Sequence, residues 1–290
     1  MAGGKRKNNA DLLAGIIVLI VAAGLLVAVL FGLRQCTGGD PEPTVPTTTT
    51  AAPTQPPSPT LAANPWESEA FAYDENGFLT CPAADSWLGV DVSEHQGHID
   101  WGEVAKTDVK FAMVRLAYRG WGSEGVVRAD EYGLENLQGA ADAGLKVGVY
   151  FFSQAISVEE AIQEARFLLQ LLDGRKLDMP VVFDWETVSA KDARTAKVKR
   201  ATVNACALAF CREIEAAGYD AMVYYNLDMA RWTFDLLAIQ QAGYDFWLAM
   251  YTDSLSYAYR VRMWQYTSAG SVPGIKGRVD LNLYFPERKP

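Results

Sequence analysis

Apolar residues follow two different periods from Trp87 to the end of the chain. Short runs rich in β-branched and aromatic residues predict strands, and they alternate with segments whose apolar residues recur at helical spacing. The predicted strands are 88–93, 111–118, 146–153, 180–186, 221–226, 245–251, 262–267 and 279–284. The predicted helices lie within Glu131–Ala143, Val158–Leu172 and Ala193–Ala217. Gly144 and Gly218 follow the first and the last of these as C-terminal caps.

This alternation predicts the fold class. Strands separated by helices imply parallel pairing, and strands that are apolar on both faces need cover on both sides. The eight predicted strands indicate a closed barrel, but the connections Thr252–Val261 and Ser268–Arg278 are too short to carry a full helix each. We therefore expect an irregular (β/α)₈-like barrel over residues 88–290, with reduced or missing helices in its second half. An open doubly wound sheet is the alternative.

A separate apolar run, Leu12–Leu33, carries no charged residue and would span roughly 33 Å as a helix at about 1.5 Å per residue. It exceeds the apolar core of about 7–15 residues in a signal peptide, so we expect an uncleaved transmembrane helix at 12–33. Lys5–Lys7 precede this run and Arg34 follows it, which predicts a cytoplasmic tail at 1–11. The remainder of this single-pass protein is expected on the outer side of the cell membrane.

The segment between the apolar run and the predicted barrel has a different composition. Residues 34–65 are rich in Pro and Thr and have no hydrophobic period, which predicts an extended linker. Residues 66–87 are expected to lead into the domain at 88–290.

Charge and cysteine content exclude several classes of partner. The net charge of −9 and the pI of about 4.9 argue against a nucleic-acid surface. The cysteines, Cys36, Cys81, Cys206 and Cys211, lack the paired spacing of a zinc site or a redox motif, and they predict no disulfide framework. Cys206 and Cys211 lie in a helical pattern and are expected to occupy core positions.

Carboxylates stand near the ends of predicted strands, where barrels carry their functional sites. In "VVFDWETVS", Asp184 and Glu186 are two residues apart, so on a strand they share a face while Trp185 turns away. Asp91 stands near the end of the first predicted strand, and Asp280 begins or lies within the last. Like charges held close together cannot both ionise freely, so one carboxyl is expected to stay protonated. A protonated carboxylic acid beside an ionised one is suited to glycosidic cleavage.

Aromatic residues cluster at the same predicted strand ends, where their faces could stack on sugar rings. These residues are Tyr118, Tyr150, Phe152, Tyr225, Tyr251 and Trp264. Together with the carboxylates they predict a carbohydrate cleft.

Several segments in order give the chain a recognisable resemblance. They are "GVDVSEHQGHIDW" (89–101), "FAMVRLAYRGWG" (111–122), "GVYFFSQA" (148–155), "PVVFDWE" (180–186), "VYYN" (223–226), "MWQYTSAG" (263–270) and "VDLNLY" (279–284). Over residues 88–285 the chain resembles the family 25 glycoside hydrolases, lysozymes that cut peptidoglycan.

The resemblance implies roles for particular residues. It makes Glu186 the general acid, and it makes Asp184 the group that orients the substrate's 2-acetamido group, whose carbonyl oxygen acts as internal nucleophile with net retention. Asp91 is then a catalytic residue of the acidic cleft. The residues implied or expected to bind substrate are Asp280, Tyr118, Tyr150, Tyr225, Tyr251, Trp264 and Gln265.

The activity implied is that of an N-acetylmuramidase without a cofactor, acting on peptidoglycan glycan strands at a bacterial cell surface. The chain departs from many family members at His95, where they have Trp before the Gln of the opening motif.

Three other readings of the sequence lead to different functions. His95 and His98 with Asp91, Glu94 and Asp100 could suggest a metal-dependent hydrolase, but these two histidines, the only ones in the chain, cannot complete a zinc shell. The sequence "GWGSEG" (120–125) matches G-x-G-x-x-G, but the helical pattern starts several residues too late for a nucleotide site.

The remaining reading is a membrane-tethered barrel that grips glycan strands without cutting them. The presence of Glu186, Asp184 and Asp91 together favours an enzyme.

Overall fold

The structure is a computed structural model that describes residues 60–286. The predicted tail at 1–11, the predicted membrane helix Leu12–Leu33, Cys36 and the linker up to residue 59 lie outside this range. Within 60–286, no helix is both long enough and apolar enough to span a bilayer.

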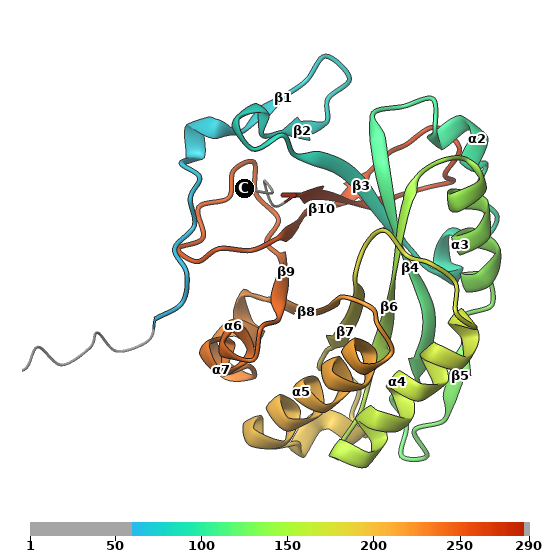
Figure 1. Cartoon of the computed structure of the whole chain (residues 1–290), viewed down its shortest axis with the longest axis vertical. Coiled ribbons are helices and arrows are strands. Elements are labelled where there is room, and N and C mark those ends of the chain that lie inside the picture. The colour runs from blue at the N-terminus through green and yellow to red at the C-terminus, as the bar shows by residue number, and fades with distance from the viewer. Residues whose placement is uncertain (1–59, 287–290) are drawn as a thin grey trace, which may run out of the picture. The chain divides into compact units, whose positions relative to one another are not determined.

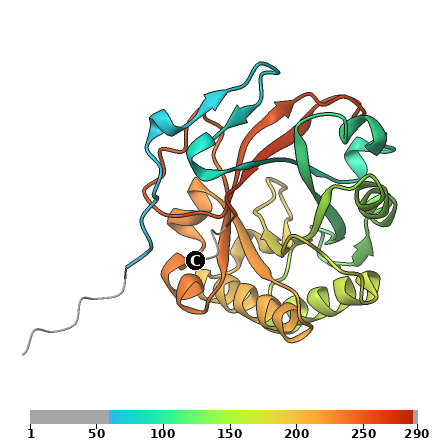
Figure 2. The ribbon, with the colours of Figure 1, turned by 45° about the horizontal axis from the view of Figure 1, so that its top comes forward.

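A closed barrel forms the centre of the described domain (Figures 1 and 2). Its strands are β3 (Trp87–Val92), β4 (Val109–Arg119), β6 (Lys146–Ser153), β7 (Val181–Trp185), β8 (Ala221–Asn226), β9 (Asp245–Ala249), β10 (Met263–Gly270) and β11 (Val279–Tyr284). The order around the barrel is β3-β4-β6-β7-β8-β9-β10-β11, and pairing of β11 with β3 closes it. Each strand coincides with a strand predicted from sequence, so the closed barrel is confirmed and the open sheet is wrong.

The direction of the last strand corrects the expectation of parallel pairing. From β3 to β10 the barrel strands are parallel, but β11 is antiparallel to both β10 and β3. The short connection 271–278 cannot carry the chain back along the barrel, so β11 must return as a hairpin partner of β10. The start of β11 therefore lies beside the carboxyl end of β3.

Helices cover the barrel mainly along its first half. The long helices are α3 (Gly133–Asp142), α4 (Val158–Leu172) and α5 (Arg200–Ala216), which pack on strands β4 to β8 (Figure 1). The shorter ones are α2 (Trp101–Val104), α6 (Leu227–Trp232) and α7 (Leu236–Gln241), with 3₁₀ turns η1 (Ser68–Ala70), η2 (Pro82–Ala84), η3 (Glu94–Gln96) and η4 (Arg194–Lys197). The connections from β9 to β10 and from β10 to β11 carry no helix in this described region, as the sequence predicted.

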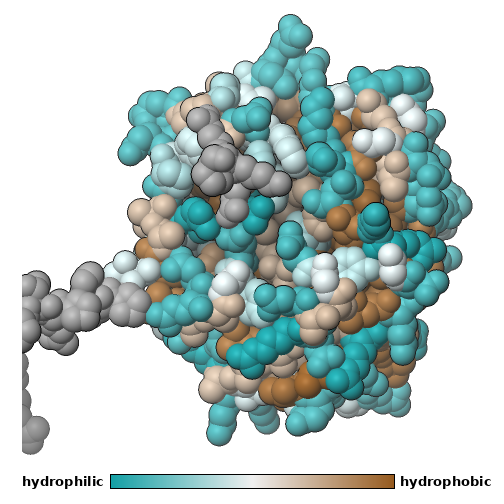
Figure 3. Space-filling view, viewed as in Figure 1, coloured by the Kyte–Doolittle hydropathy of each residue, from teal (hydrophilic) through white to brown (hydrophobic). Residues whose placement is uncertain are grey.

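Alternation along the strands separates the core into two layers. One side chain in two faces the barrel interior, where Phe111, Met113, Met222 and Trp247 pack together. The alternate positions, such as Phe183, pack outward against the helices. Both Cys206 and Cys211 are buried in this outer layer as free thiols, which confirms the core positions predicted for them. The face in Figure 3 is mainly hydrophilic, with hydrophobic residues in separate patches.

The segment before β3 packs on the barrel. Ala62 N–H donates to Gln240 Oε1 at 2.8 Å, so residues 60–65 of the predicted linker already lie against the domain. An antiparallel hairpin of β1 (Ala72–Tyr73) and β2 (Leu79–Thr80) follows. A further short strand, β5 (Val127–Ala129), pairs antiparallel with the end of β4. None of these short strands was predicted, because two or three residues are too few to show a period.

Candidate active site

A pocket of about 280 Å³ lies at the carboxyl ends of the parallel strands. The carboxyl groups of Asp91, Asp184, Glu186 and Asp280 line it together. Three of these come from strand ends, while Asp280 reaches the same place because antiparallel β11 starts there. The structure thus brings together the acidic residues that the sequence singled out.

Strand alternation at the end of β7 orients the first carboxylate pair. Asp184 and Glu186 both line the pocket, whereas Trp185 is buried on the opposite face. The Trp185 indole Nε1–H donates to the carbonyl oxygen of Ala155 at 2.9 Å, which fixes the strand end against the loop after β6. The predicted shared face of Asp184 and Glu186 is confirmed.

Asp184 is the deeper of the two carboxyl groups. Its side chain is 5% exposed, and within residues 60–286 its Oδ1 has no hydrogen-bond partner. Burial, followed by the charges of Glu186 and Asp91, raises the pKa of Asp184 well above its ordinary value. The orphaned oxygen is an acceptor site at which a ligand N–H would be satisfied.

Glu186 stands nearer the mouth of the pocket. Burial, and then the charge of Asp280, raises the pKa of Glu186 to about 6. Like charges were expected to keep one carboxyl of this pair protonated, but the first cause of the raised pKa is burial at both Asp184 and Glu186. Gln154 Nε2 donates to the backbone carbonyl of Glu186 at 2.6 Å and fixes its position.

Asp91 is held by side-chain amides at the floor of the pocket. Its Oδ2 accepts hydrogen bonds from Asn282 Nδ2 at 2.7 Å and from Gln265 Nε2 at 2.9 Å. Burial and the charge of Asp280 raise the pKa of Asp91 to about 8, although these amide hydrogen bonds lower it. Burial also raises the pKa of Asp280 to about 6. Near neutral pH the pocket therefore contains both protonated and ionised carboxyl groups.

The amide of Gln265 links the floor to the wall of the pocket. Its Oε1 accepts hydrogen bonds from Tyr251 Oη at 3.0 Å and from Tyr224 Oη at 3.4 Å. The floor amide of Asn282 is itself oriented by the indole of Trp247, whose Nε1 donates to Asn282 Oδ1 at 2.9 Å. The acidic residues and aromatic walls thus form one connected network.

The predicted aromatic residues divide into three groups, which lie in the pocket, in an adjoining groove and in the buried core. Tyr150, Phe152 and Tyr251 line the pocket as expected. Tyr118 lies in an adjoining groove of about 450 Å³, which shares Phe152 with the pocket and also contains exposed Trp121. The adjoining groove therefore extends the pocket along the end of the barrel.

Tyr225 and Trp264 do not belong to the pocket, which corrects their assignment to substrate binding. Both are fully buried in the layer between barrel and outer elements. Alternation is the reason, because their neighbours Tyr224 and Gln265 face inward. The indole of Trp264 donates to the carbonyl oxygen of Met250 at 2.7 Å instead.

Sequence reasoning missed several pocket residues. Arg115, Tyr224 and Trp247 line the pocket but were not proposed. Asn282, which is buried and donates to Asp91, was also missed, although it stands two residues after Asp280 on β11. Tyr224 on β8 and Trp247 on β9 face the barrel interior, but in these strands only residues near the strand ends were considered. The period of two was the signal that could have identified them.

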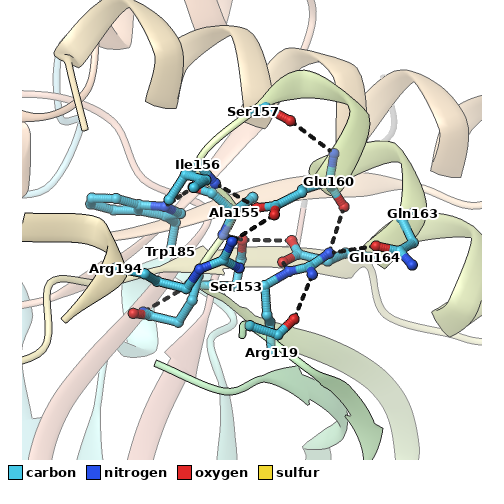
Figure 4. Close-up of polar contacts among 12 residues, drawn as sticks. Arg119, Ser153, Ala155, Ile156, Ser157, Glu160, Gln163, Glu164, Trp185 and Arg194 are labelled. Carbon is cyan, nitrogen blue, oxygen red and sulfur yellow. Dashed lines mark hydrogen bonds and ion pairs between the residues drawn. The ribbon is translucent and has the colours of Figure 1, made fainter. Parts of the chain in front are cut away.

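A second polar network joins the ends of β4 and β6 to α4 (Figure 4). Arg119, at the end of β4, pairs with Glu164 of α4 through Nε at 2.6 Å, and Ser153 Oγ donates to the other oxygen of Glu164 at 2.6 Å. Arg119 and Glu164 are almost fully buried, and burial raises the pKa of Glu164 to about 7. The nearby pair Arg194–Glu160 ties the loop after β7 to α4. The network joins the segments that carry the active-site loops.

The structure also bears on two of the alternatives raised by the sequence. The loop "GWGSEG" (120–125) joins antiparallel β4 and β5 at the edge of the adjoining groove, so no helix follows it and the nucleotide-site reading is wrong. His98 Nδ1 lies 2.6 Å from Glu135 Oε1, while His95 lines the pocket. Among residues 60–286, no group of His, Cys, Asp and Glu side chains is arranged to hold a metal ion.

Comparison with known proteins gives a consistent result. The sequence profile of the glycosyl hydrolases family 25 matches residues 90–275. The uncharacterised protein YegX of Escherichia coli strain K12 is 31% identical over 221 residues, which cover 71% of this chain and 72% of that protein. An autolytic lysozyme of Clostridium acetobutylicum is 25% identical over 203 residues, which cover 68% of this chain and 55% of that protein.

A solved structure shares the fold. The modular autolysin LytC of Streptococcus pneumoniae, in complex with a synthetic peptidoglycan ligand, superposes with a TM-score of 0.62 at 22% identity. The match covers 78% of this chain and 52% of LytC, so the chain spans about half the length of that autolysin.

Proposed function

The chain belongs to glycosyl hydrolase family 25, and from this membership and the acidic pocket we propose that it hydrolyses the β-1,4 bond between N-acetylmuramic acid and N-acetylglucosamine in peptidoglycan. It is a glycosidase of the lysozyme type. The observation that carries the proposal is the pocket in which Glu186, with its pKa raised to about 6, stands beside the unpartnered oxygen of Asp184.

Glu186 supplies the proton in the proposed reaction. As the bond between C1 of the muramic acid and O4 of the glucosamine breaks, the Glu186 carboxylic acid protonates the leaving oxygen. Its position at the mouth lets it exchange protons with water afterwards, so that it can act as a base toward the attacking water. A pKa near 6 suits a group that serves first as acid and then as base.

Asp184 is proposed to position the substrate's 2-acetamido group. Its unpartnered Oδ1 accepts the acetamido N–H, which aims the acetamido carbonyl oxygen at C1. That oxygen forms a bond to C1 as the glycosidic bond breaks, and water later displaces it. Inversion at each step gives net retention of configuration, as in other substrate-assisted glycosidases.

Asp280, whose pKa is about 6, is proposed to stabilise positive charge at the reacting sugar in its ionised form. Asp91, whose pKa is about 8, is fixed by Gln265 and Asn282 and is proposed to hold the sugar by hydrogen bonding in its protonated form. Asp280 faces Asp91 from the neighbouring strand. Tyr251, which is 56% exposed at the mouth, offers a ring face to a sugar.

We also propose that the domain is attached to a cell membrane by Leu12–Leu33, with the tail at 1–11 in the cytoplasm. The supporting observation is the uncharged run long enough to cross a bilayer and the Lys5–Lys7 cluster before it. A substrate in the cell wall suits a hydrolase held on the outer side of that membrane.

Product analysis tests the proposed reaction. The full-length chain, purified in detergent, would be incubated with peptidoglycan, and the new reducing ends would be reduced and identified. Reducing-end muramic acid supports the proposed bond, and NMR of fresh product, taken before mutarotation and before reduction, should show the retained β configuration. Glucosamine ends would show that the bond is wrongly assigned, and binding without any new ends would favour a glycan-gripping barrel.

A further inference from the structure

A groove of about 460 Å³ lies outside the active-site pocket, between the β1–β2 hairpin and the ends of β9 and β10. The residues that line it include Tyr73, Asn76, Thr252, Thr267 and Ser271. Tyr251 lines both this groove and the pocket, so the two form a continuous path across the rim of the barrel. We call this feature the hairpin groove.

The hairpin that forms its outer wall is firmly attached. Phe71 meets the ring of Trp264 edge-on, with ring centroids 5.3 Å apart, and both Phe78 and Leu79 are buried. At the other side of the groove, Tyr73 Oη donates to Asp253 Oδ1 at 2.6 Å. The groove is therefore held open by packing and does not require a partner to form it.

The chemistry of the lining suits a neutral sugar. Tyr73 is 52% exposed and Tyr251 is 56% exposed, so two aromatic faces are available at the groove. Hydroxyl and amide side chains stand between them, and the acidic side chain among the lining residues, Asp253, already accepts a hydrogen bond from Tyr73. Aromatic faces combined with neutral donors and acceptors match the ring faces and hydroxyl groups of N-acetylated sugars.

We propose that the hairpin groove is an additional subsite for the glycan strand, which receives sugar residues beyond those held in the pocket. This inference rests on the proposed hydrolase function, because the occupant is the same strand that enters the pocket past Tyr251. The hairpin at residues 72–80 precedes the residues matched by the family profile, 90–275, so one wall of the groove comes from outside the matched residues. The consequence of the subsite is a preference for long glycan strands over short fragments.

Binding measurements on a non-hydrolysing background test the subsite. The full-length chain carrying Glu186→Gln would be titrated calorimetrically with a disaccharide fragment and with long glycan strands of peptidoglycan. Adding Tyr73→Ala should weaken binding of long strands by about three- to tenfold, the range expected for loss of one aromatic contact, and should lower the long-to-short affinity ratio. Tyr73→Phe keeps the ring and should keep that ratio.

Trp232 provides the matched control. It is 75% exposed on α6 and belongs to neither the pocket nor the hairpin groove, so Trp232→Ala removes an exposed aromatic ring elsewhere and should leave the ratio unchanged.

The outcomes separate the subsite from the proposed function. If long strands bind the Glu186→Gln chain equally tightly with and without Tyr73→Ala, the subsite is overturned but the proposed function is not. An equal loss of affinity for long and short ligands would also overturn it, because the effect would then be structural. A Glu186→Gln chain that binds no glycan, together with a parent chain that releases no reducing ends, would remove the proposed function and the subsite with it.

Discussion

Asp280 on β11 is paired directly with Asp91 on β3 across the antiparallel ladder that closes the barrel. Because paired residues of neighbouring strands lie side by side, the charge of Asp280 acts on Asp91 and raises its pKa after burial has done so. The same charge is the second cause, after burial, of the raised pKa of Glu186. Asp280 thus influences the floor and the mouth of the pocket together.

The pH dependence of the reaction should report this influence. Glu186 must be protonated to act as the acid, so kcat/KM should fall as the pH rises through about 6. Asp280→Asn removes a negative charge that favours protonated Glu186, so the alkaline limb of the kcat/KM profile should move to lower pH. The control is Asp142→Asn on the surface of α3, which should leave the pH profile unchanged. A limb that stays in place in Asp280→Asn would contradict this coupling.

Replacing the proposed acid should sharply reduce turnover while the fold survives. Glu186→Gln retains size and polarity but cannot donate the proton, so kcat should fall by about 10²- to 10⁴-fold. Initial rates of reducing-end release measure the effect, and thermal unfolding checks the fold. Glu131→Gln makes the same exchange at an exposed position and should leave the rate unchanged. Substantial turnover by Glu186→Gln would assign the acid to another carboxyl group.

Asp184→Asn should separate positioning from electrostatic coupling. The amide keeps one acceptor oxygen but replaces the other with an N–H donor and cannot carry negative charge. The hydrogen bond to the acetamido N–H is therefore weakened, and kcat should fall by about 10²-fold or more because the nucleophilic oxygen is less well aimed at C1. Its alkaline limb should stay near that of the parent chain, since burial and Asp280 set the pKa of Glu186. The pH profile of the residual activity decides this, and a limb shifted to lower pH would show that the charge of Asp184 acts on Glu186 after all.

The buried Arg119–Glu164 pair should matter more for stability than a surface pair. Arg119→Met leaves Glu164 buried without its cation, which should reduce the free energy of unfolding by roughly 3–5 kcal/mol when Glu164 is ionised. Arg166 pairs with Glu213 on the surface, so the matched change Arg166→Met should cost about 1 kcal/mol or less.

The stability loss in Arg119→Met should also depend on pH. The cation lowers the pKa of Glu164, so its removal raises that pKa above the value of about 7 found with Arg119 in place. The folded variant then binds a proton more tightly than the unfolded chain, and stability falls as the pH rises from the unfolded value of about 4.3 through the folded pKa. Urea unfolding at about pH 5 and about pH 8 measures this, and equal losses at both would contradict a buried carboxylate as the cause.

The proposed membrane anchor can be tested apart from the chemistry. If Leu12–Leu33 is retained as a spanning helix, the full-length protein should stay with membranes through high-salt and carbonate washing, because insertion of such a helix is effectively irreversible. Immunoblotting of the washed fractions measures retention. A shortened protein released into the medium would instead indicate cleavage after the apolar run.

Much of the barrel could be predicted because its strands are apolar runs that carry their own period. The direction of β11 could not be read from its residues, since "VDLNLY" has the same pattern whichever way it runs. The length of the connection 271–278 predicts the direction of β11, because so short a connection cannot lead to a parallel neighbour. The hairpin of β1 and β2 depends on contacts with β10 that are distant in sequence.

The site was predictable where the alternation of side chains between the two faces of a strand was taken into account. This alternation correctly placed Asp184 and Glu186 on one face. The aromatic residues, however, were chosen because they stand near strand ends, whichever face they occupy. On β10, Trp264 and Gln265 cannot both face inward, and Gln265 does. The raised pKa values of the carboxyl groups also depend on burial, which no local pattern in the sequence reveals.

Trp66 stacks on Phe285, with ring centroids 6.1 Å apart, where the chain enters and leaves the described domain. Phe285 follows Tyr284, which is paired with Trp87 at the start of β3, so this meeting point lies at the end of the barrel away from the pocket. Neighbouring ends make a domain easy to rearrange or transplant. A short peptide joining them, with the chain reopened in a surface loop, should yield a working circular permutant, and the barrel could be inserted whole into a host protein with its mouth left unobstructed.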